Sequence, residues 1–473
     1  MKKISIYISI FSLLISCTDN FKDATDFTTV TDPSLTESAV LGTPNSSQIW
    51  LSGLERNMSI TLNEILILAE LGSDNYENTQ TFYNQFLDGL EIRIDDPDMR
   101  DTQFQIAEVR NSAQYGLTTI GPNDPEYKTT TEAEYHFFEG MSYLFAGMYF
   151  SALPQEPLGA PVSSAENLAS AITSLDLAID LNPKPEYYLA KARANYYLGN
   201  KAEARTAAQN ALSLDDDFLR GAQYDQKEGP VNRFESALYQ RATFDDFQPL
   251  PTLDFLDPKY SFLDPELDQS VYYLKAEEAH LILAEANLSD NNALAAQSNM
   301  ENLLTLVDNR EVRSINDSVE DRDDNEPGSR PDSADIVVNG RTDLVLSRKD
   351  GLIDVPSISG TSLELTDIPS ITATDAGLEL LYRTRQEIFI AEGLRFVDMG
   401  IKLVIFQEEI SLNPNISEGD ASTVKVVPSF IAAVADDLDA FTYDKDAKTV
   451  ETTINVNEIL VDNKGSEQVL PFH

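Results

Sequence analysis

Ala178-Ile-Asp-Leu-Asn-Pro183 is echoed 33 residues later by Ala211-Leu-Ser-Leu-Asp-Asp216. Between these two stretches, 186–198 and 202–214 have the composition and spacing of helices, and Gly199-Asn200 separates them as a turn. A single pair of helices cannot bury its own apolar face, so a repeat of this length predicts neighbouring helical hairpins that pack against it.

The repeat resembles a tetratricopeptide hairpin. Small Ala204 and Ala211 stand where its paired helices must approach closely, and Tyr188 takes the large aromatic position. The resemblance is partial, because larger apolar or aromatic residues are usual at the positions of Lys191, Asn195 and Ala208. Neighbouring hairpins are predicted from 131–153 with 165–181, and from 272–286 with 293–307. A helix with apolar residues every three or four positions also ends at Gly72, and another covers 99–119.

These patterns predict a mostly α fold in which tetratricopeptide-like helical hairpins form a right-handed superhelix. We expect the helical body to cover residues 37–310, with its hairpins at about 131–307. We expect residues 311–376 to form a loop-rich insertion with short strand-like pieces at 335–338 and 343–346, because helical period is missing there. Residues 377–473 then provide one long helix over 378–402 and a tail with strand-like stretches at 449–456 and 458–461.

The start of the chain reads as an export signal. Lys2 and Lys3 precede an apolar run from Ile4 to Ile15, which is too short to span a bilayer as a helix but has the proportions of a signal-peptide core. The run ends at Cys17, the only cysteine, in a context that resembles the bacterial lipobox. We expect 1–16 to be removed, Cys17 to carry palmitate or similar acyl chains, and the polar segment 17–36 to act as a tether.

The composition is strongly acidic. The formal charge is −45, and removal of Lys2 and Lys3 with the signal peptide takes it to −47. Such a surface repels nucleic acid, so no nucleic-acid partner is expected. A hydrophobic share of 42% still suffices for a globular core.

The same features, in this order, resemble the SusD/RagB family of Bacteroidetes surface lipoproteins. Leu71-Gly-Ser-Asp-Asn-Tyr76 follows the first helix, and the aromatic helix and Pro/Gly-rich loop of 133–161 come next. Late in the chain, Arg385-Gln-Glu387 and Glu392-Gly-Leu-Arg395-Phe-Val-Asp398 are similar to the family's Arg–Glu, Glu–Gly–x–Arg, Asp pattern.

The resemblance implies a lipid-anchored protein on the outside of the outer membrane, which captures a nutrient for a SusC-like TonB-dependent transporter. A glycan is the family's usual ligand, but this chain has one tryptophan, on an apolar helix stripe, where exposed tryptophans are common in glycan-binding members. Peptides or another solute therefore remain alternatives. A surface scaffold that uses its tetratricopeptide-like hairpins to assemble proteins is the rival from another class.

Two sets of residues in the motifs are candidates for a role. Arg385, Glu387, Glu392, Arg395 and Asp398 either form a structural ion-pair lattice, which we favour, or bind an anionic ligand. Ligand capture favours aromatic rings flanked by amides and carboxylates, because sugar C–H faces stack on rings while hydroxyl groups take hydrogen bonds. The residues of that kind after the first helix are Asp74, Asn75, Tyr76 and Tyr83, for which ordinary packing is the alternative.

Metal binding and catalysis have weaker signals. Asp321, Asp323 and Asn325 alternate like the first half of a calcium loop, but Glu326 takes the position where the sharp turn needs Gly. A solvated acidic loop is the simpler interpretation, with a looser calcium site as the alternative. The three histidines have no metal-ligand spacing and no nucleophile motif is present, so we expect a binding protein without catalytic activity and without a cofactor.

Overall fold

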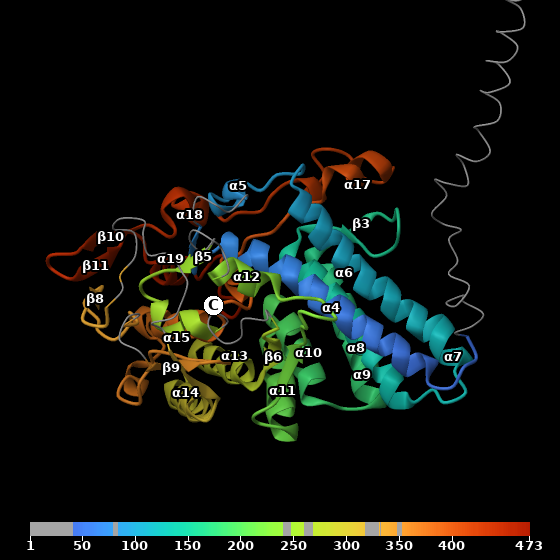
Figure 1. Cartoon of the computed structure of the whole chain (residues 1–473), viewed down its shortest axis with the longest axis horizontal. Coiled ribbons are helices and arrows are strands. Elements are labelled where there is room, and N and C mark those ends of the chain that lie inside the picture. Colours follow the sequence, from blue (N-terminus) through green and yellow to red (C-terminus); the bar gives the residue numbers. More distant parts are fainter. Residues whose placement is uncertain are drawn as a thin grey trace, which may run out of the picture.

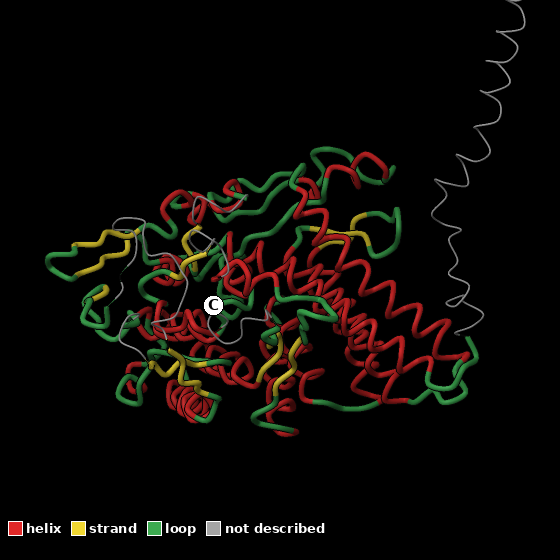
Figure 2. Tube along the Cα trace, in the orientation of Figure 1, coloured by secondary structure: helices red, strands yellow, loops and turns green. Residues whose placement is uncertain are grey.

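The computed structural model describes residues 41–78, 84–239, 247–259, 268–316, 331, 333–347 and 352–473. Helices dominate this part of the chain, and the strands are short and scattered between them (Figure 2). The α-helices are α4 (Ser46–Leu71), α5 (Gln85–Asp88), α6 (Pro97–Tyr115), α7 (Gly121–Asn123), α8 (Thr129–Tyr149), α9 (Ser164–Leu181), α10 (Pro185–Tyr197), α11 (Lys201–Leu214), α12 (Arg233–Tyr239), α13 (Ala276–Ser289), α14 (Ala293–Asp308), α15 (Asp375–Ile388), α16 (Leu394–Asp398), α17 (Gln407–Leu412), α18 (Ser429–Ala432) and α19 (Val456–Asp462).

The described strands pair into five small sheets. One has the order β10-β11-β8, and the others are the pairs β1-β5, β2-β3, β4-β6 and β7-β9. All pairings are antiparallel except that of β11 with β8. The strands are β1 (Tyr76–Asn78), β2 (Ala152–Pro154), β3 (Pro161–Ser163), β4 (Leu219–Ala222), β5 (Phe247–Pro249), β6 (Val271–Lys275), β7 (Val312–Asn316), β8 (Val337–Val338), β9 (Leu352–Pro356), β10 (Phe441–Asp444) and β11 (Thr449–Thr452).

The long helices α4, α6, α8 and α9 run alongside one another through one half of the molecule, and β8, β10 and β11 lie at the opposite end (Figure 1). Helix α8 is the centre of the helical half, because it packs against both α6 and α9. Its Gly140 and Gly147 face α9 so closely that an added Cβ would lie 2.9 Å from Leu175 and 2.7 Å from Leu168, respectively. Glycine is needed at both positions for this approach.

The predicted hairpins are confirmed. Helix α8 packs with α9, α10 with α11, and α13 with α14, while α10 also contacts α9 and α11 also contacts α13. The faces of α11 meet its neighbours through Ala204, Ala207, Ala208 and Ala211, all of which are buried. One detail differs from the prediction, since Tyr187 is fully buried against Phe137 and Tyr188 is only partly buried. The fold class, mostly helical with paired helices, is as predicted.

The predicted helix over 378–402 is wrong. Helix α15 ends at Ile388, and the backbone turns through Ala391 (φ 61°) and Gly393 (φ 75°) before α16 begins at Leu394. The stretch 458–461, predicted as a strand, belongs to helix α19. Of the strand-like pieces predicted in the insertion, 335–338 contains β8, whereas 343–346 is not a strand.

One large apolar core extends from α4 to Phe472, near the end of the chain. Five residues of the insertion and the tail form a separate small cluster: Ile336, Val338, Leu344, Val345 and Val450. Trp50 is partly buried against the large core, and its indole Nε1 donates to the carbonyl of Ser112 at 2.8 Å. None of the helices in the described ranges is long and apolar enough to cross a bilayer.

Candidate functional site

The turn after α15 gathers charged side chains beneath the helix. We call this set the ionic cluster, and all of its members are buried: Asp74, Lys259, Lys275, Arg385, Glu392, Arg395 and Asp398. Four of them belong to the motif that was singled out in the sequence. A single helix would have placed three of them, Arg385, Glu392 and Arg395, on one face, but α15 and α16 are separate helices.

Arg385 joins α15 to the end of α16. Its Nε and Nη2 donate to the two carboxylate oxygens of Asp398 at 2.7 and 3.1 Å, which is a bidentate pair. Tyr197 of α10 donates to Asp398 at 3.0 Å and accepts from Arg385 at 3.3 Å. Three elements are therefore held together at one buried point.

Glu392 receives two buried lysines. Lys275 Nζ lies 2.6 Å from its carboxylate and also donates to the carbonyl of Ile388, while Lys259 forms an ion pair with the same carboxylate and donates to the carbonyl of Ile390. These carbonyls belong to the end of α15 and the following turn, where helical partners are missing, so the lysines cap the helix. Burial lowers the pKa of Lys259 to about 8, against the opposing attraction of Glu392.

Asp74, Asn75 and Tyr76, which were predicted to bind ligand, are buried after α4. Arg395 donates to both oxygens of Asp74, at 2.5 and 2.8 Å, and Asn75 donates to Glu70 at 2.7 Å. The ring of Tyr76 packs edge-on against aromatic rings of α12 and β5. Of these three residues, Asp74 lines a cavity.

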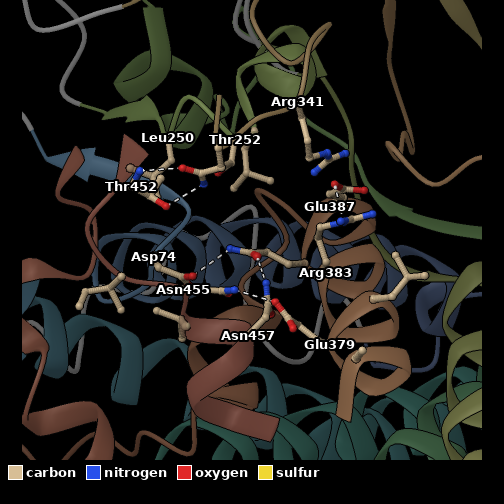
Figure 3. A pocket seen from close by; sticks show the side chains of 17 residues that line it. Asp74, Leu250, Thr252, Arg341, Glu379, Arg383, Glu387, Thr452, Asn455 and Asn457 are labelled. Atoms are coloured by element: carbon tan, nitrogen blue, oxygen red, sulfur yellow. Dashed lines mark hydrogen bonds and ion pairs between the residues drawn. The ribbon is translucent and has the colours of Figure 1, made fainter. Parts of the chain in front are cut away.

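That cavity lies on the side of α15 that faces the strands of the insertion and the tail, and we call it the α15 pocket (Figure 3). Its volume is about 300 Å³, at the lower end of the range of small-molecule sites. Its walls come from α15, α19, β11, the turn after β8 and the segment after β5. The lining residues are Asp74, Leu250, Thr252, Leu253, Asn339, Arg341, Ala376, Glu379, Leu380, Arg383, Gln386, Glu387, Thr452, Ile454, Asn455, Val456 and Asn457.

The turn after β8 positions Arg341 in this wall. Asn339 and Gly340 both have positive φ, 48° and 77°, as a tight two-residue hairpin turn requires. The turn is closed by mutual backbone hydrogen bonds between Val338 and Arg341, and Asn339 is anchored to β11 through Thr452. The Asn339-Gly340 dipeptide is the sequence signal for this turn.

Glu387 lies at the edge of the pocket and is held from outside α15. One of its oxygens accepts from the hydroxyl of Thr361 at 2.7 Å and from the backbone amide of Ser362 at 2.8 Å, and the other accepts from the Ser362 hydroxyl at 2.5 Å. Arg383 lies one turn away on α15, with its Nε 3.8 Å from Glu387. Glu387 thus connects the insertion to α15.

A second cavity of about 590 Å³ lies between α4, the β4-β6 pair and the loop that follows β4. The side chains of Arg220 and Tyr224, which line this cavity, already have partners within the protein. Arg220 pairs with Glu134 at 3.1 Å and donates to the Tyr273 hydroxyl at 3.2 Å, and Tyr224 donates to the carbonyl of Ser59. Arg56, which is exposed, also lines this cavity.

Some predicted residues cannot be placed. Cys17, Tyr83 and the suggested calcium ligands Asp321, Asp323 and Asn325 lie outside the described residues. In the part of the chain that the structure does describe, no group of three or more His, Cys, Asp or Glu side chains could hold a metal ion.

The sequence matches no protein-family model and no curated relative. Solved structures do match. A protein from Bacteroides vulgatus named for sugar binding superimposes with a TM-score of 0.55 at 13% identity, covering 79% of this chain and 97% of the other. A SusD-like carbohydrate binding protein from Bacteroides vulgatus has a TM-score of 0.51 at 13% identity, with 76% and 83% coverage. A SusD-like protein from Bacteroides fragilis has a TM-score of 0.51 at 13% identity, with 78% and 87% coverage.

These likenesses extend over most of both chains in each case, although sequence identity is low. The resemblance inferred from the sequence motifs is confirmed at the level of the fold. This chain has a SusD-like fold.

Proposed function

We propose that this chain is a surface lipoprotein, anchored to the outer membrane through Cys17, that captures a nutrient and delivers it to a TonB-dependent transporter without chemistry of its own. A glycan is the ligand class we propose first. The likeness to proteins named for carbohydrate or sugar binding supports this choice.

The α15 pocket is the observation that carries the proposal. The charges of the ionic cluster are paired with one another, whereas Arg341 and Arg383, which line a cavity of ligand size, have few hydrogen-bond partners in the described part of the chain. A cavity with polar groups left over on a rigid scaffold is suited to hold a solute reversibly.

Calorimetry with the purified full-length lipoprotein in detergent tests the capture role. We expect at least one member of a panel of neutral and acidic oligosaccharides to bind, whereas binding of peptides alone would move the ligand class to the alternative named above. If neither class binds, the capture role is wrong.

Two further measurements test the anchor and the delivery role. Cys17→Ser should abolish labelling of the chain by a palmitate analogue and release it from the membrane fraction, whereas labelling of the variant would contradict lipidation at Cys17. Affinity isolation from outer membranes should recover a TonB-dependent barrel. Recovery of other surface proteins without a barrel would favour the assembly scaffold.

A further inference from the structure

Two arginines face the α15 pocket with little engagement from the protein. In the described part of the chain, the side chain of Arg383 makes no hydrogen bond, its Nε is buried, and its single ion pair is the 3.8 Å contact with Glu387. Arg341 makes one side-chain hydrogen bond, to the hydroxyl of Ser362. A guanidinium has five N–H donors, so most of this donor capacity is unused.

The two guanidinium groups are close enough to affect each other. Burial lowers the pKa of Arg341 and the positive charge of Arg383 lowers it further, while the carboxylates of Glu387 and Asp367 act in the opposite direction without cancelling the shift. Two like charges held near one cavity repel, and an anion between them would relieve that repulsion. Figure 3 shows both side chains beside Glu387 at one end of the pocket.

The carboxylates of the pocket are already engaged. Asp74 pairs with Arg395, Glu387 accepts three hydrogen bonds from Thr361 and Ser362, and Glu379 accepts from Asn455 at 2.6 Å. Most carboxylate oxygens in these walls therefore have a protein partner among the described residues, whereas Arg341 and Arg383 keep N–H groups without one. A ligand rich in acceptors would fit this distribution.

The rest of the lining narrows the chemistry of that ligand. None of the lining residues that the structure describes has an aromatic ring, whereas a neutral sugar typically stacks its C–H face on one. Thr252 makes no hydrogen bond among the described residues, and the Thr452 hydroxyl accepts from Asn339 and keeps its own hydrogen to donate. Hydroxyl groups near a pair of arginines suit a ligand that carries both a carboxylate and hydroxyl groups.

The strands around the pocket do not favour an extended peptide. Peptides commonly bind by adding a strand to a free sheet edge. Strand β11 has β10 on one side and β8 on the other, and Val338 of β8 forms a further bridge with Arg341. No edge of β11 is free.

We infer that the α15 pocket binds the carboxylate of an acidic sugar, with Arg341 and Arg383 as its two cationic ligands. This rests on the proposed capture function and specifies its substrate class as a uronate-containing oligosaccharide. The overall charge of −45 repels such a ligand at long range. At physiological ionic strength this repulsion is screened beyond about 8 Å, so the contacts in the pocket decide the affinity.

Titration calorimetry of the full-length lipoprotein tests the inference with oligogalacturonate and oligoglucuronate trisaccharides, their methyl esters and triglutamate. Charge-assisted pairs are about twice as strong as neutral ones, so we expect at least one acid to bind tenfold or more tightly than its ester. Arg383→Met and Arg341→Met should each remove that preference. Arg56→Met is the matched control, because it deletes an arginine from the second cavity, and it should leave the preference unchanged.

Four results would overturn the inference. Two concern the ligands alone: equal binding of acid and ester, or no binding of either uronate at 1 mM. The other two are tighter binding of triglutamate than of either uronate, and an acid preference that survives Arg383→Met and Arg341→Met at an unchanged melting temperature. Binding of neutral oligosaccharides distinguishes a failure of the acidic-sugar assignment from a failure of the capture function. If they bind while the uronates show no advantage, the capture function stands and only the acidic-sugar assignment fails. If no saccharide or peptide binds at all, the capture function itself fails.

Discussion

Helix α15 carries two arginines, two residues apart, whose surroundings are opposite. The side chain of Arg385 is 2% exposed and forms a bidentate pair with Asp398 in the ionic cluster. The side chain of Arg383 is 31% exposed, lines the α15 pocket and makes no hydrogen bond in the described part of the chain. Successive residues of an α-helix are about 100° apart around its axis. Arg383 and Arg385, two positions apart, therefore point about 200° away from each other and face different surroundings.

The comparison shows how a structural charge can be told from one available to a ligand. A buried charge is tolerated when its partners satisfy it, and removing one partner leaves the other uncompensated. A charge whose donors remain unused beside a cavity contributes little to the folded state and can take an external partner. Arg385 in the ionic cluster and Arg383 in the α15 pocket are these two cases on one helix.

The largest expected effect is in the ionic cluster. Arg385→Met should lower the free energy of unfolding by about 4 kcal/mol, because Asp398 would stay buried without its cation. Urea-induced unfolding followed by circular dichroism measures this loss. The double variant Arg385→Met/Asp398→Leu is the control and should recover much of it. A loss below about 1 kcal/mol in the single variant would mean that the pair is not structural.

Arg395→Ala tests whether the predicted motif acts in the fold or in binding. Its removal would leave the buried carboxylate of Asp74 without its bidentate donor and Asn457 without its 2.8 Å hydrogen bond. We expect a loss of about 3 kcal/mol and a lower melting temperature, measured by scanning calorimetry. Weaker ligand binding at unchanged stability would instead assign Arg395 to the binding site.

Glu285 is a buried acid near the ionic cluster that hydrogen-bonds only to the hydroxyls of Tyr196 and Tyr382 among the described residues. Burial raises its pKa from 4.5 to about 7. The folded protein therefore binds this proton more tightly than the unfolded chain does. The resulting stability is complete below about pH 4.5 and is lost as the pH rises through about 7.

Glu285→Gln should remove this pH dependence, which amounts to up to about 3 kcal/mol between pH 4.5 and 7. Unfolding free energies of the variant and the parent, measured across that range, give the difference. Glu70, whose pKa burial also raises to about 7, stays in both proteins and serves as the common background. Parallel curves for the two proteins would show that Glu285 is not protonated in the fold.

Much of the helical scaffold followed from sequence period, because each helix in the hairpins buries a regular apolar face. The break after α15 did not, since residues 388–401 are apolar enough to continue a helix. Tertiary contacts decide it: Tyr149 donates to the carbonyl of Gly393, and the buried lysines take carbonyls that a continuing helix would have used. The run 458–461 was ambiguous because a short apolar run fits a strand or a helix.

The candidate site was less predictable than the fold. Asp74, which the sequence singled out for ligand binding, lines the α15 pocket, but Arg341 and Arg383 belong to no local motif. They meet because β8 pairs with β11, at Val337–Thr449 and Val338–Val450, and this brings the turn after β8 to α15. Such pairing between distant segments leaves no periodic signal in a single sequence.

The thermal unfolding of Arg383→Met, with and without the oligosaccharide that binds the parent best, tests the central claim most directly. A half-buried, weakly paired charge such as Arg383 contributes at most about 1 kcal/mol, so without ligand the melting temperature should stay close to that of the parent. The ligand-induced rise, which follows from binding to the folded state alone, should be lost. A melting temperature that falls as in Arg385→Met, or a ligand-induced rise that is retained, would contradict the division of roles between the two faces of α15.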